Sequence, residues 1–191
     1  MVIGSPATRG RWHNRLMFTR LAVFLLYVSA LAYGQSNPLT TGAKRDFTAV
    51  KNYFIRSADK MSDADYAFRP TPDVRTFGQI VAHVADDQYN LCAAIKGETR
   101  KESYTHLEET LSTKADLVSA LKKSFDYCDA AYALITDANA AAPLKGGSMN
   151  GRTNLLQMYW NIWHTWEHYG NVVVYLRMKG LVPPSSERSA K

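Results

Sequence analysis

The chain of 191 residues has few cysteines and histidines, two and five respectively, and it lacks several patterns that would define its class. It shows no convincing alternation of apolar and polar residues, which argues against a β-sheet protein. It shows no internal repeat, which argues against a repeat architecture. The apolar run Leu21–Ala32 is about a dozen residues long, short of the roughly 20 that span a bilayer. The length instead fits one domain with a sizeable core.

Beyond the N-terminal segment the sequence also lacks a lysine and arginine stripe and any alternation of basic and aromatic residues. The formal charge of +6 depends on residues 1–34, which contain four arginines and no acidic residue. Removing those four from the 23 basic residues leaves 19 against 17 acidic ones, a net charge of +2. We therefore expect no nucleic-acid partner.

Residues 1–34 have the organisation of an export signal. A basic leader precedes the apolar run, and small residues then allow cleavage after Ala32 or Gly34. We predict that this segment is a cleaved signal peptide and that the protein is exported, to the periplasm or out of the cell. The alternative is that this segment is not cleaved and anchors the protein in a membrane. We expect no other part of the chain to contact a membrane.

The two cysteines, Cys92 and Cys128, both lie after the export segment. Export to an oxidising compartment would permit a disulfide between them. The alternative is that both are small buried side chains without a bridge. We assign neither cysteine as a metal ligand or as a nucleophile.

Four stretches of the chain place apolar residues at three- and four-residue intervals, the spacing of an amphipathic helix. They run from about 41 to 61, 76 to 96, 113 to 135 and 153 to 179. In the second stretch, Thr76 and Gln79 match a capping box, and Gly97 comes directly after the last residue. These patterns predict an all-α protein with a four-helix bundle over residues 40–184.

The predicted helices are joined by long connections. Pro70 and Pro72 exclude a continuous helix between the first and second stretches. Residues 98–111 are charged and poorly periodic, so we expect a loop there. Residues 137–151 form a connection of the length often found in site-facing loops. We expect residues 185–191 to be a disordered tail.

The fourth stretch is rich in aromatic and aliphatic residues on several sides, which predicts a central, largely buried helix. This helix and the size of the bundle leave room for a homodimer. One narrow face of the helix is polar and carries Asn161, His164, His168, Asn171 and Tyr175. A polar row on a buried helix is costly unless its groups are paired or hold an ion.

His164 and His168 are four residues apart, so on a helix both imidazoles leave the same face and can share a metal ion. The alternative is a pair of hydrogen-bonded core histidines. By spacing alone, His83 and His106 are both candidates for a third ligand. His106 lies in a charged stretch, where a solvated side chain is the simpler interpretation.

Asp87 lies four residues after His83 and should share its helix face, and Asp86 lies three residues after it. Asp87 is our first candidate for a catalytic acid or base, and Asp86 is the next. The alternative for either carboxylate is to orient a histidine ring by accepting its N–H.

The chain resembles the DinB-like (YfiT-related) family of four-helix-bundle metalloproteins over about residues 40 to 186. The similar segments are FRPTPDVRTFGQIVAH, which ends at His83, and HTWEHYGN, which begins at His164. The resemblance implies that His83, His164 and His168 are the metal ligands and that His106 is not. Three imidazoles suit zinc, nickel or iron(II).

The resemblance also implies a function in which the ion acts on a small molecule. We expect a metal-dependent hydrolase or a thiol-dependent transferase of unknown substrate, since relatives include transferases that use bacillithiol or mycothiol. Export argues against the thiol version, because such cofactors are chiefly intracellular. The alternative is a non-catalytic metal-binding or stress-related protein.

Overall fold

A computed structural model describes residues 37–99, 101, 105–144 and 151–187. The chain divides into two units, Met1–Asn37 and Pro38–Lys191. The described helices all belong to the second unit, and the predicted export signal lies outside the described residues. Among the described helices, none combines the length and apolar character needed to cross a membrane.

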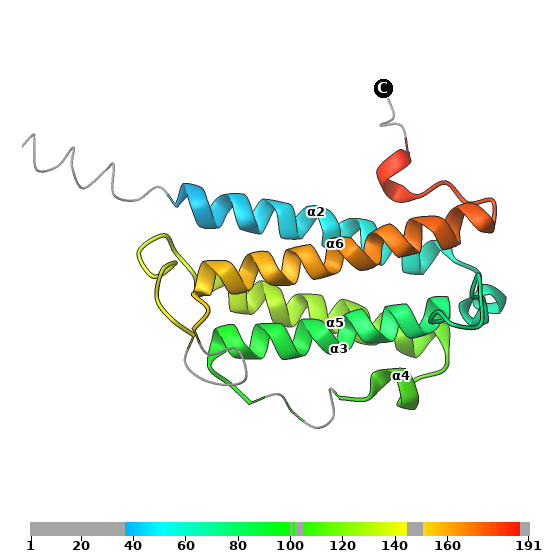
Figure 1. The fold of residues 1–191 in the computed structure, drawn as a ribbon, viewed down its shortest axis with the longest axis horizontal. Helices are drawn as coiled ribbons and strands as arrows, with labels where there is room; N and C mark the ends of the chain where they lie inside the picture. Colours follow the sequence, from blue (N-terminus) through cyan, green and yellow to red (C-terminus); the bar gives the residue numbers. More distant parts are fainter. Residues whose placement is uncertain (1–36, 100, 102–104, 145–150, 188–191) are drawn as a thin grey trace, which may run out of the picture. The chain divides into compact units, whose positions relative to one another are not determined.

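The described part of the second unit is built from helices, and Figure 1 shows its four long ones side by side. These are α2 (Pro38–Lys60), α3 (Phe77–Lys96), α5 (Lys114–Ala133) and α6 (Asn154–Met178). The shorter ones are η2 (Asp63–Ala67), α4 (Leu107–Thr110) and η4 (Pro184–Ser186). In the described residues the only β-type pairing is an isolated bridge between Pro143 and Thr153, so the all-α prediction is confirmed.

The helix ends are explained by local side-chain chemistry. The Thr76 hydroxyl accepts a hydrogen bond from the Gln79 backbone N–H, and the Gln79 side chain accepts one from the Thr76 N–H, completing the expected capping box. Gly97 ends α3 with a φ of 70°, a left-handed conformation that glycine adopts without steric cost. Thr113 and Thr153 cap α5 and α6 through their side-chain hydroxyls, as Thr76 caps α3.

The start of α2 depends on a distant residue and falls earlier than predicted. The Asp137 carboxylate accepts hydrogen bonds from the backbone N–H groups of Leu39 and Thr40, at 3.1 and 2.9 Å. It therefore caps a helix 97 positions away in sequence. The periodic apolar pattern contains no trace of this cap, so the predicted start lay near residue 41 rather than at Pro38.

A buried polar layer joins α3 to α6 in the centre of the bundle. Gln88, Asn161 and Thr165 are fully buried. The Gln88 side-chain amide donates to the Thr165 hydroxyl at 2.8 Å, and the Asn161 amide donates to the Gln88 side-chain carbonyl at 2.9 Å. Because a shift of one helix past the other would leave these groups unpaired and buried, the layer fixes the register of α3 against α6.

The fourth long helix is less buried than its composition predicts. Trp160, Trp163 and Trp166 expose 44%, 55% and 36% of their surface. The helix packs mainly against α2 and α3, so apolar residues elsewhere on its circumference stay outside the core. The expectation of a largely buried helix was therefore wrong for this face.

The expected disordered tail is ordered at its beginning. Pro184–Ser186 forms the 3-10 helix η4, and the Ser185 backbone N–H donates to the Tyr169 hydroxyl at 3.0 Å. A proline at the start of η4 fixes the backbone, and Tyr169 anchors it to α6. Residues 188–191 lie outside the described residues.

Cys92 and Cys128 form a disulfide that joins α3 to α5, which decides between the two alternatives left open by the sequence. Both residues are fully buried. In the chain-entropy view, a bridge between positions 36 residues apart stabilises the fold by restricting the unfolded chain.

Replacing both cysteines by alanine should lower the free energy of unfolding by about 3–4 kcal/mol, because the loop constraint is lost. Chemical denaturation of the oxidised protein measures the change. Added reductant serves as the control, since it should destabilise only the wild type. Equal stability of variant and oxidised wild type would contradict a stabilising bridge.

Candidate metal centre

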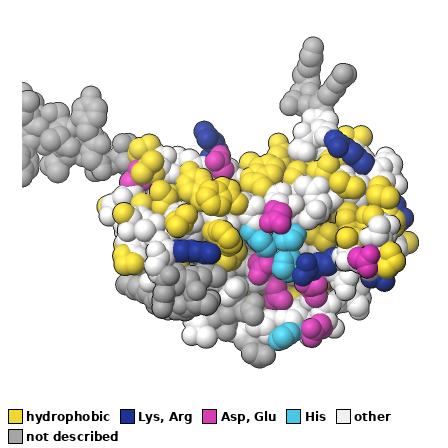
Figure 2. Space-filling model, in the orientation of Figure 1, with side chains coloured by type: hydrophobic (Ala, Val, Ile, Leu, Met, Phe, Trp, Pro, Cys, Tyr) yellow, Lys and Arg dark blue, Asp and Glu magenta, His cyan; other side chains and the backbone are white. Residues whose placement is uncertain are grey.

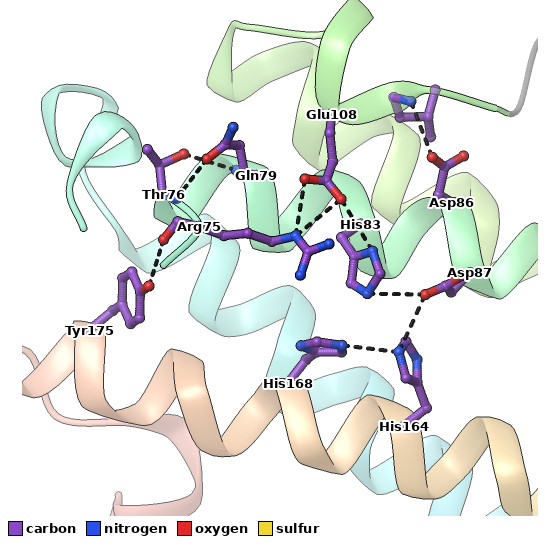
Figure 3. A network of polar contacts seen from close by, with 11 residues as sticks. Arg75, Thr76, Gln79, His83, Asp86, Asp87, Glu108, His164, His168 and Tyr175 are labelled. Carbon is purple, nitrogen blue, oxygen red and sulfur yellow. Dashed lines mark hydrogen bonds and ion pairs between the residues drawn. The ribbon is translucent and has the colours of Figure 1, made fainter. Parts of the chain in front are cut away.

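Three histidines from two helices meet at one point of the described structure. His83 lies on α3, and His164 and His168 lie on α6 one turn apart. One ring nitrogen of each lies within 4.8 Å of the others, a grouping that can hold a metal ion (Figure 3). His106 lies elsewhere, at the start of α4, with 64% of its side chain exposed. The structure thus brings together the three histidines that the family resemblance implied.

The environment keeps two of these imidazoles neutral. Burial lowers the pKa of His168 to about 3, and the neighbouring His164, His83 and Arg75 act in the same direction. Burial also lowers the pKa of His164, although the carboxylate of Asp87 acts against this shift. A neutral imidazole has a free nitrogen lone pair, which is the form that binds metals.

Asp87 lies directly beside the histidine cluster. Its Oδ2 is 3.1 Å from Nε2 of His83 and 3.3 Å from Nε2 of His164, while Nε2 of His164 and His168 are 3.0 Å apart. Ligand atoms bound tetrahedrally at about 2.0–2.1 Å from an ion are spaced at roughly 3.3 Å, close to these separations. Asp87 thus shares the ligand face of α3, as its spacing indicated.

The donor set also fits a transition metal chemically. Nδ1 of His164 and Nδ1 of His168 are buried without a hydrogen-bond partner in the described structure, while both Nε2 atoms face the cluster. Three imidazoles with one adjacent carboxylate are ligands that zinc, nickel and iron(II) accept. The three histidines therefore fit a divalent transition-metal ion. Their chemistry does not distinguish between zinc, nickel and iron(II).

Glu108 orients His83 and is a site residue that the sequence interpretation missed. Its carboxylate lies 3.2 Å from Nδ1 of His83 and accepts hydrogen bonds from Nε of Arg75 at 3.0 and 3.1 Å (Figure 3). A neutral ring has one N–H, so when Nδ1 donates to Glu108 the lone pair of Nε2 faces the cluster. Carboxylates in this position fix the ring and increase its basicity as a ligand.

The single helical turn α4 brings Glu108 to this place. Leu107 is buried, and its backbone N–H donates to Oδ2 of Asp86 at 3.2 Å. Asp86, our second candidate for a catalytic acid or base, thus anchors α4 against α3. The expected loop over residues 98–111 contains this turn, and four helical residues are too few to produce a detectable apolar period.

A pocket of about 490 Å³ lies next to the cluster and includes His168 in its wall. Its other lining residues are Pro70, Thr71, Asp73, Val74, Arg75, Ile80, Asn171, Val174 and Tyr175. The volume lies in the usual range for small-molecule sites. Figure 2 shows histidine and acidic side chains gathered on this face of the molecule, with apolar groups on either side. A small molecule in this pocket would therefore contact one of the three clustered histidines.

These features define a class of protein, an all-α bundle with a three-histidine site that can hold a metal ion between two helices. Comparison with protein families identifies the family to which the chain belongs. The model of the DinB superfamily matches residues 46–172, so the chain belongs to the DinB superfamily. The family resemblance noted in the sequence is confirmed. Comparison with curated proteins finds no match.

Solved structures of DinB-like proteins have a similar fold. One from Bacillus cereus superposes with a TM-score of 0.62 at 18% identity, covering 75% of this chain and 95% of its own. Another, from Bacillus subtilis, has a TM-score of 0.60 at 19% identity and covers 80% of this chain and 100% of its own. At these identities the similarity establishes the fold alone.

Replacing Glu108 by alanine should weaken metal binding about 10- to 100-fold, because His83 loses the acceptor that orients its ring. Competition with a chromophoric chelator measures the affinity. Glu109→Ala is the matched control, since the Glu109 carboxylate faces the exposed His106 ring at 3.7 Å, and this variant should bind metal as the wild type does. Equal affinities of the two variants would contradict the role of Glu108.

Lowering the pH from 6.5 towards 4.5 should destabilise the metal-free protein. His168 binds a proton at an ordinary pKa of 6.5 when unfolded and at about 3 when folded. Between these values the unfolded chain takes up more protons, so this contribution to stability is complete above pH 6.5 and is lost as the pH falls. Thermal unfolding in chelator across this range measures the effect. His168→Gln should flatten the dependence, and an unchanged slope would contradict the assignment.

Proposed function

We propose that the protein is a metal-dependent enzyme, a hydrolase that acts on a small molecule bound in the pocket beside His168. The observation that carries the proposal is the position of this pocket, because one of the three clustered histidines forms part of its wall. An ion held by three imidazoles supplies Lewis acidity and can lower the pKa of a coordinated water to about 7.

The surrounding side chains have separate tasks in this proposal. His83, His164 and His168 would hold the ion, and Glu108 keeps the His83 ring in the tautomer that presents Nε2. Asp87 lies within hydrogen-bond reach of two of the rings and is the carboxylate placed to accept or return a proton at Oδ2. The apolar walls of the pocket exclude water from the body of the substrate.

The same donor set would also suit a thiol-dependent transferase, because zinc and related ions bind thiolates well. Export of the protein, which we propose from residues 1–34, would separate it from the intracellular pool of low-molecular-weight thiols. For this reason a hydrolase is the better proposal, with thiol transfer as the second reaction to be assayed.

A non-catalytic metal-binding protein is the second candidate function, and the position of Asp87 favours it. If Oδ2 of Asp87 binds the ion, four protein ligands would close a tetrahedral site and leave no position for a substrate. The two candidates therefore assign different tasks to one carboxylate, and substitution of Asp87 separates them.

Asp87→Asn should retain metal with an affinity close to that of the wild type and lose about 10²- to 10⁴-fold in activity if Asp87 transfers protons. Metal content and turnover are measured together, with esters, amides and thiol acceptors as substrates. A large loss of metal affinity in this variant would instead support the closed, non-catalytic site.

Variants of the histidines provide the controls for this experiment. His83→Ala and His168→Ala should both lose stoichiometric metal, whereas His106→Ala, whose ring lies outside the cluster, should retain it. Full retention of metal by both cluster variants would refute the three-histidine site and with it the proposed chemistry.

A further inference from the structure

Arg75 is the charged residue of the pocket whose position is best fixed. Its backbone carbonyl accepts a hydrogen bond from the buried Tyr175 hydroxyl at 2.6 Å. Its side chain is held by Glu108, which accepts from Nε at 3.0 and 3.1 Å. These contacts at the backbone and at Nε reduce the freedom that the side chain, 45% exposed, would lose when the guanidinium binds a ligand.

Within the described structure, these side-chain contacts use only Nε of the guanidinium. In Figure 3 the dashed lines from the Arg75 side chain reach Glu108 alone, and the guanidinium points towards the space between α3 and α6 near His83 and His168. The two terminal nitrogens form a planar pair of donors, a geometry that matches a carboxylate with two parallel hydrogen bonds.

The charges that line the pocket favour a singly charged ligand. Among the described residues of the lining, Arg75 is the one arginine or lysine, and Asp73 is the one acidic residue. Arg75 is already ion-paired with Glu108 at 3.0 Å, and Asp73 adds a negative charge, so the pocket has no charge to neutralise a dianion such as phosphate. A carboxylate carries half that charge and can accept two parallel hydrogen bonds from the terminal nitrogens of Arg75, which the contacts with Glu108 do not use.

The rest of the lining suits a short apolar body. Pro70, Val74, Ile80 and Val174 contribute aliphatic surface around the same space. Val74 and Val174 expose 42% and 50% of their surface in the structure, so a ligand that covers them gains from removing apolar area from water.

We infer that the pocket binds small carboxylates with a short apolar chain, and that Arg75 is the residue that recognises the carboxylate. The inference that such carboxylates are substrates rests on the proposed function, and it places the bond to be cleaved towards His168. The recognition itself depends on Arg75 and the apolar walls and needs no ion.

Binding of sodium hexanoate to the metal-free protein, measured by NMR chemical shifts, tests the inference. Wild type should bind hexanoate saturably and should bind neutral hexanamide about tenfold more weakly, the effect of losing a charge-assisted hydrogen bond. Arg75→Gln should bind hexanoate about tenfold more weakly than wild type, and Arg75→Lys should fall between them because it keeps the charge without the planar pair.

Arg69→Gln is the matched control, because Arg69 lies in the same segment but donates to the Pro72 carbonyl and is outside the described lining of the pocket. It should bind hexanoate as the wild type does. Equal binding of hexanoate by wild type and Arg75→Gln would overturn the inference, as would hexanoate binding that appears only after metal is added.

Two outcomes separate carboxylate recognition from the proposed enzyme. Binding of hexanoate that depends on Arg75, in a protein without hydrolase or transferase activity, would support carboxylate recognition and refute the enzyme. Metal-dependent turnover of neutral substrates that is insensitive to Arg75→Gln would support the enzyme and overturn the carboxylate class. Circular dichroism of each variant confirms that it is folded.

Discussion

The metal centre depends on the buried hydrogen bonds that fix α3 against α6. The clustered histidines come from both helices, so their nitrogens meet only at one register of the pair. Gln88, Asn161 and Thr165 set that register beside His164, since any other would leave buried polar groups unpaired. The disulfide between α3 and α5 adds a covalent constraint to the same core. The buried polar layer therefore positions the three histidines, although none of its residues belongs to the histidine cluster.

A chain of charged groups connects the histidine cluster to the pocket. Glu108 accepts from both His83 and Arg75, so one carboxylate orients a ring of the cluster and a residue of the pocket wall. Its position depends on Asp86 and Leu107, which hold the single turn α4 against α3. Through Glu108, the orientation of the His83 ring is thus coupled to the direction of the Arg75 guanidinium. The turn α4 that carries Glu108 is too short to show an apolar period in the sequence.

Much of the fold could be predicted because it depends on local patterns. Apolar periodicity located four helices to within a few residues, and Thr76 with Gln79 located the start of α3 through a cap contained in four residues of sequence. Where the partner is distant, prediction failed. Asp137 caps α2 from 97 positions further along the sequence, and the exposed tryptophans of α6 reflect which sides of that helix have neighbours.

The sequence by itself determined that His164 and His168 share a helix face and that Asp87 shares one with His83, because helical spacing fixes the direction of side chains on one element. Only the tertiary structure decided that these faces meet, that Glu108 and Arg75 belong to the site, and that a pocket lies beside His168. The reason is physical. Contacts within a helix are set by its period, whereas contacts between elements depend on packing and register, which no single segment encodes.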